Sequence, residues 1–213
     1  WKTELPERAM EASSASPEAF QVDELIVDEA QDLVSDNYLG VFDLLLKGGL
    51  EKGCWKMFGD FEKQSIYSGD FDSEAARKHL GGLAASYALR INCRNTPRIG
   101  ELARMLGGLN PNYKRILRPD NGVEPEIHYY PDGAAQLATL GKVLDDLVSR
   151  RYSPRDIIVL SPRADNASAA SLLPVSRKFR LKSCASATEG DVRFGTIHSF
   201  KGMESVVVIV TDI

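Results

Sequence analysis

The sequence lacks several features that would assign it to a class directly. No apolar run approaches the roughly 18 residues that a membrane span requires, and the start has no signal-peptide pattern. Cysteine is scarce: Cys54, Cys93 and Cys184 are scattered, and they lack metal-ligand spacing. The three histidines are equally dispersed, which argues against a zinc site. These absences predict a cytoplasmic, intracellular protein with reduced thiols and no membrane partner.

The composition is that of a globular protein, but the charge is unevenly distributed. Hydrophobic residues make up 43% of the 213 residues, and the net charge is −4. Residues 1–92 carry a net charge of −8, whereas residues 93–213 carry +4. This asymmetry favours two lobes with different partners, and a chance distribution is the alternative. Because the chain begins at Trp1 and ends just after an apolar run, we expect a piece of a longer protein.

Two adjacent carboxylates follow a short apolar run near the start of the chain. The run Leu25-Ile26-Val27 predicts a buried parallel strand, and Asp28 and Glu29 come directly after it. Open α/β sheets bind ligands at the carboxyl ends of their strands. A nucleotidase needs such a pair, in which Asp28 would hold Mg²⁺ and Glu29 would activate the attacking water. The alternative is a strand followed by a solvated acidic turn.

Two further apolar runs end in polar residues. The run 55–58 precedes Gly59, Asp60 and Gln64, and the run 87–91 precedes Asn92 and Arg94. We expect these polar strand ends to converge with Asp28 in one cleft, where an arginine can stabilise charge on a transferring phosphoryl group. A surface ion pair is the alternative for Arg94.

The remaining pattern alternates strands and helices, which predicts an α/β fold with parallel sheets and a lobe boundary near residues 92–97. Residues 1–20 are expected to form a linker or short helix, and 107–122 a long loop. Thr96 and Pro97 fit the start of a helix whose apolar face carries Ile99, Leu102, Ala103 and Leu106. Other helices are expected at 38–46, 134–148 and 166–173, and other strands at 126–130, 156–160, 192–197 and 206–210.

With these segments in place, four stretches resemble motifs of the UvrD/Rep/PcrA group of superfamily 1 helicases, in the family's order. They are Val27-Asp-Glu-Ala-Gln-Asp32 (motif II, the Walker B), Gly59-Asp-Phe-Glu-Lys-Gln-Ser-Ile-Tyr67 (motif III), Leu89-Arg-Ile-Asn-Cys-Arg-Asn-Thr96 (motif IV) and Thr196-Ile-His-Ser-Phe-Lys-Gly-Met-Glu204 (motif V). Each motif is short, but four motifs in the family's order and at plausible spacing are a strong signal.

The resemblance implies two RecA-like lobes, with ATP and Mg²⁺ between them and single-stranded nucleic acid across them. The first lobe, 1–92, would be incomplete, and the second would span 93–213. DNA is favoured over RNA by the resemblance alone. Catalytic roles are implied for Glu29, Gln64 and Arg94, nucleotide contacts for Asp28, Asp60, Lys201 and Glu204, and nucleic-acid contacts for Tyr67, Thr196 and His198. Tyr67 could stack on a base or be a buried core tyrosine.

The sequence also departs from the family. No G-x-x-x-x-G-K-[ST] phosphate-binding loop occurs, and the arginine of motif VI is absent. Cys93 replaces the tyrosine that stacks on adenine in many relatives, and residues 161–195 leave no room for the usual large insertion. We therefore expect a fragment of an ATP-dependent helicase or translocase that is inactive on its own. The alternative is a non-catalytic nucleotide- or nucleic-acid-binding module that has lost its phosphate-binding loop.

Overall fold

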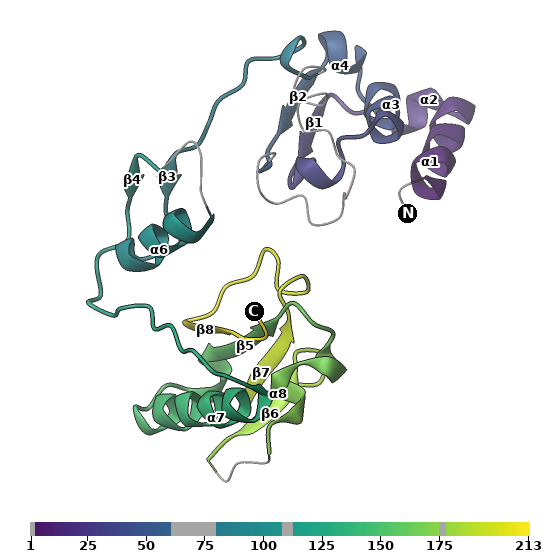
Figure 1. The fold of residues 1–213 in the computed structure, drawn as a ribbon. Helices are drawn as coiled ribbons and strands as arrows, with labels where there is room; N and C mark the ends of the chain where they lie inside the picture. Colours follow the sequence, from purple (N-terminus) through teal and green to yellow (C-terminus); the bar gives the residue numbers. More distant parts are fainter. Residues whose placement is uncertain (1–2, 61–79, 108–112, 175–177) are drawn as a thin grey trace. The chain divides into compact units, whose positions relative to one another are not determined.

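The structure is a computed structural model that describes residues 3–60, 80–107, 113–174 and 178–213 (Figure 1). The chain divides into two compact units, Trp1–Leu89 and Arg90–Ile213. Each unit combines helices with small parallel sheets, so the predicted α/β class is confirmed at that level. None of the described helices has the length and apolar character to cross a membrane.

The first unit is built around two parallel strands joined by helices. Its elements are α1 (Glu4–Ala15), α2 (Pro17–Phe20), β1 (Glu24–Val27), the 3-10 turn η1 (Ala30–Asp32), α3 (Asp36–Leu45), α4 (Gly49–Lys52) and β2 (Cys54–Met57). β1 pairs with β2 from Glu24 opposite Cys54 to Val27 opposite Met57. Val27 of β1 shares one buried cluster with Leu39 and Phe42 of α3, so α3 packs on this strand pair.

The second unit begins with a small parallel pair and a helix. β3 (Ile91–Asn92) pairs with β4 (Arg115–Ile116), and α6 (Pro97–Gly107) connects them. α6 begins at Pro97, as predicted. Its expected apolar face, however, is largely exposed: Ile99 is 45% and Leu106 is 74% accessible.

A four-stranded parallel sheet forms the rest of the second unit, in the order β6-β7-β5-β8. Its elements are α7 (Gly133–Ser149), η2 (Pro154–Asp156), β5 (Ile157–Ser161), η3 (Asp165–Ala167), α8 (Ala169–Leu172), β6 (Arg180–Ser183), β7 (Asp191–Thr196) and β8 (Val207–Val210). Figure 1 shows α7 lying along the sheet, where Leu140 and Leu144 join a buried cluster with Ile157 and Val192. The strand expected at 126–130 is wrong, because these residues form no regular element.

Candidate functional site

The acidic pair lies where the sequence predicts it, just beyond the carboxyl end of β1. Asp28 and Glu29 are both exposed, and the Glu29 N–H donates a hydrogen bond of 2.9 Å to the Asp28 carboxylate. Glu29 has a φ of 50°, in the left-handed region that non-glycine residues rarely adopt. Such backbone strain is concentrated at functional sites in proteins, which makes the turn after β1 a candidate site.

Gln31 holds the Glu29 side chain and was not singled out from the sequence. It is only 1% exposed, and its Nε2 donates a hydrogen bond of 2.5 Å to Glu29 Oε2. Its other amide atom, Oε1, accepts a hydrogen bond of 3.0 Å from the Asp60 N–H. One buried amide therefore joins the residues after β1 to the residues after β2.

The backbone supports the same junction. The Phe58 N–H donates to the Val27 carbonyl, and the Ala30 N–H donates to the Phe58 carbonyl, each at 2.8 Å. A Cβ on Gly59 would lie 2.5 Å from Gln31 Oε1, so this position accepts no side chain without displacing the amide. Gly59 is thus explained by its close approach to the turn after β1.

The donor set at this junction fits a hard cation only in part. Mg²⁺ prefers oxygen ligands and is usually held by one or two carboxylates together with substrate phosphates, and Asp28 and Glu29 supply carboxylates of that kind. Across the described segments, no group of three or more His, Cys, Asp or Glu side chains could hold a metal by itself.

Gln64 and Tyr67, the other motif III candidates, lie outside the described residues. Three residues separate Asp60 from Gln64 here, against two in the usual motif pattern. Their expected roles stay predictions, as does the shared cleft with Arg94, because Asp28 belongs to the first unit and Arg94 to the second.

Arg94 lies in a turn that is organised by Asn92. Asn92 is 7% exposed, and its side-chain Oδ1 accepts from the N–H groups of Arg94 and Asn95 at 2.9 and 3.0 Å. Arg118 donates to the Arg94 carbonyl at 2.7 Å. The backbone of Arg94 is therefore fixed while its side chain is exposed, an arrangement suited to an arginine that reaches a ligand. The Thr96 hydroxyl, expected to cap α6, is buried without a hydrogen-bond partner among the described residues.

The residues of the stretch that resembles motif V occupy a tight turn after β7. Thr196 Oγ1 accepts from the Ser199 N–H at 2.9 Å, and the Thr196 carbonyl accepts from Ser199 Oγ and the Phe200 N–H. His198 and Glu204 are exposed, Lys201 is half-buried, and Gly202 turns the chain with a φ of 79°. The turn begins at the carboxyl edge of the sheet, because Thr196 is paired with Ser161 at the end of β5.

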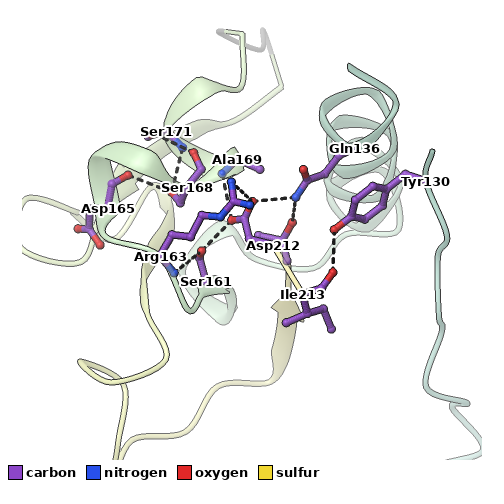
Figure 2. Close-up of polar contacts among 11 residues, drawn as sticks. Tyr130, Gln136, Ser161, Arg163, Asp165, Ser168, Ala169, Ser171, Asp212 and Ile213 are labelled. Atoms are coloured by element: carbon purple, nitrogen blue, oxygen red, sulfur yellow. Dashed lines mark hydrogen bonds and ion pairs between the residues drawn. The ribbon is translucent and has the colours of Figure 1, made fainter. Parts of the chain in front are cut away.

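A buried carboxylate at the same edge was also missed by the sequence analysis (Figure 2). The Asp212 side chain is 1% exposed. It accepts hydrogen bonds from Ser161 Oγ (2.7 Å), Gln136 Nε2 (2.9 Å) and the Ala169 N–H (3.1 Å), and Arg163 lies 3.9 Å away. Asp212 thereby links β8, β5, α7 and α8. The only sequence signal was a lone acid two residues after an apolar strand.

Burial alone would raise the pKa of the Asp212 carboxyl. The hydrogen bonds from Ser161, Ala169 and Gln136, together with the Arg163 charge, outweigh burial and hold this pKa below its usual range. Asp212 is therefore a charged group that is satisfied by its surroundings and stabilises the carboxyl edge of the sheet.

Comparison with protein-family models and with curated proteins gives no match to this chain.

Proposed function

We propose that this chain is part of an ATP-dependent helicase or translocase that moves on single-stranded nucleic acid. DNA is favoured over RNA as the substrate. The observation that carries the proposal is the junction after β1 and β2. There a left-handed Glu29 beside Asp28 is tied by buried Gln31 to Asp60. This tie unites two stretches that resemble motifs II and III, although about thirty residues separate them. We propose further that the two units correspond to two RecA-like lobes, the first incomplete.

The proposed chemistry assigns one task to each carboxylate. Asp28 would hold Mg²⁺, which supplies charge neutralisation on the phosphates when bound with ATP. Glu29 would accept a proton from the attacking water, and its exposure leaves it accessible to that water. Arg94, with its backbone fixed by Asn92, would contribute positive charge to the γ-phosphate. Gln64 would sense that phosphate, and Asp60, Lys201 and Glu204 would lie on the nucleotide side.

The nucleic-acid side of the proposal rests on the turn after β7 and on charge. Thr196 and His198 would contact the strand, and Tyr67 would stack on a base. Residues 93–213 carry a net charge of +4, although the whole chain is at −4, and this favours attraction to phosphates in that half.

The test measures ATP turnover by the complete gene product, in which we expect a phosphate-binding loop. Glu29→Gln should lower kcat by about 10²- to 10⁴-fold, because it removes the base, while ATP binding persists. Glu51→Gln changes an exposed glutamate of α4 and is the matched control, with turnover unchanged. The 213-residue chain alone should release no more phosphate than the same chain that carries Glu29→Gln.

Two outcomes would contradict the proposal. Near-normal ATP turnover in the Glu29→Gln variant would show that Glu29 is not the base that activates the attacking water. A complete gene product that binds nucleotide or nucleic acid, yet never hydrolyses ATP, would support the non-catalytic module instead.

A further inference from the structure

The buried amide of Gln31 hydrogen-bonds to two separate turns, which packing alone does not require. Its amide is buried at 1% exposure, although the two groups it binds belong to the exposed Glu29 and the half-buried Asp60. Burying an amide is costly unless both of its ends are paired. Here both ends are paired, one with a side chain and the other with a backbone N–H from a different strand.

The chemistry of the two partners fixes which way the amide points. The Glu29 carboxylate accepts hydrogen bonds only, so it must face the Nε2 donor of Gln31. The Asp60 N–H donates only, so it must face Oε1. A glutamate at position 31 could serve Asp60 but not Glu29, and an apolar residue could serve neither. A glutamine is therefore matched to this position by its donor and its acceptor together.

We infer that Gln31 is a positioning residue for the proposed hydrolysis. It orients the Glu29 carboxylate and couples that carboxylate to the Gly59-Asp60 turn, from which the chain continues toward Gln64. This inference rests on the proposed function, because orienting Glu29 matters for turnover only if Glu29 is the base. In metal sites, removing the outer-shell partner that orients a ligand typically lowers metal affinity or activity about 10- to 100-fold. By analogy, removing the amide that orients Glu29 should lower turnover by a similar factor.

The test compares two substitutions that separate the two hydrogen bonds. Gln31→Met keeps the side-chain length and removes both bonds, whereas Gln31→Glu keeps the acceptor for Asp60 and removes the donor to Glu29. Gln136→Met is the matched control, because Gln136 is a buried glutamine of α7 whose amide also bonds two partners.

The first readout is turnover of the complete gene product. Gln31→Met and Gln31→Glu should each lower kcat by about 10- to 100-fold. Their KM for ATP should stay within about twofold, because Asp28 is untouched. Gln136→Met should lower the unfolding midpoint but leave kcat unchanged, which separates positioning from a general loss of stability. A kcat within about twofold of wild type in Gln31→Met would overturn the inference.

The second readout is amide hydrogen exchange at Asp60 in the 213-residue chain, which requires no turnover. Exchange should be slow in wild type and in Gln31→Glu, and at least tenfold faster in Gln31→Met. Equal exchange in wild type and Gln31→Met would overturn the coupling of the two turns. Failure of the proposed function is recognised separately, because the wild-type gene product itself would then hydrolyse no ATP, and the positioning role would fall with it.

Discussion

Glu29 and Asp212 share an unusual position in their respective units. Each lies two residues beyond a parallel strand, each has a positive φ (50° and 64°), and each carboxylate accepts a hydrogen bond from a buried glutamine. A left-handed non-glycine residue costs about 1–3 kcal/mol, which the surroundings must offset. The difference between them is exposure: Glu29 faces solvent, whereas the Asp212 side chain is enclosed. The first suits a reacting group and the second a structural one.

Asp212→Asn tests the structural role. The folded carboxyl has a lowered pKa, so the carboxylate contributes stability above its unfolded pKa, and this contribution is lost as the pH falls through the folded pKa. At pH 7 the variant should lose about 1–3 kcal/mol of unfolding free energy, because Ser161 and Ala169 lose a charged acceptor. Urea unfolding at several pH values measures the difference, which should shrink below about pH 4.

Asp146→Asn is the control for that experiment. Asp146 pairs with Arg150 on the exposed face of α7, where an ion pair contributes little, so the change should stay within about 0.5 kcal/mol. A loss in Asp212→Asn that is equally large at every pH would mean that shape, and not charge, accounts for it.

Among the elements, α7 is the helix whose packing is most clearly defined. Leu144 is 0% exposed and lies in the cluster formed with β5 and β7. Leu144→Ala should lower the unfolding free energy by about 2–5 kcal/mol, because it removes buried contacts and leaves a cavity. Lys142→Ala on the exposed side of the same helix should change stability by less than about 0.5 kcal/mol. Urea midpoints followed by circular dichroism compare the two, and a loss below about 1 kcal/mol for Leu144→Ala would contradict this packing.

Elements with a strong local pattern were predictable from sequence. The helix expected at 134–148 is observed at Gly133–Ser149, where Asp132 caps it by accepting from the Ala135 N–H at 2.8 Å. The strand that precedes Asp28 is observed at Glu24–Val27, but the expected burial holds only for Val27, because Ile26 is 61% exposed. The periodic apolar positions of the helix and the apolar run of the strand are both local patterns, so no tertiary information was needed to place these two elements.

Elements that depend on a partner were not predictable. Residues 126–130 have strand-forming side chains but pair with no strand among the described residues, and Ile127 and Tyr129 are 58% and 90% exposed. β6 was missed, because Arg180 and Lys182 give an outer strand of the sheet a polar sequence. The link between Gln31 and Asp60 was missed for a similar reason, since it exists only once β1 and β2 are paired.

At the scale of the whole molecule, charge is divided along the chain in a way that bears on nucleic-acid binding. Residues 1–92 have a net charge of −8 and residues 93–213 a net charge of +4. Only the second half offers a net attraction to phosphates, and the first half opposes it. Binding driven by such charge depends on the release of counterions, so it weakens as salt rises.

We therefore expect the 213-residue chain to bind single-stranded DNA weakly and without sequence preference. If about four phosphates are neutralised, the affinity should fall roughly 10- to 50-fold between 50 and 200 mM salt. Fluorescence anisotropy with labelled oligonucleotides measures this fall, and oligonucleotides of different sequence should agree within about threefold. A methylphosphonate oligonucleotide, which lacks the backbone charge, is the control and should not bind. Tight binding that persists at 200 mM salt, or a clear sequence preference, would show that contacts to the bases, and not backbone charge, govern the interaction.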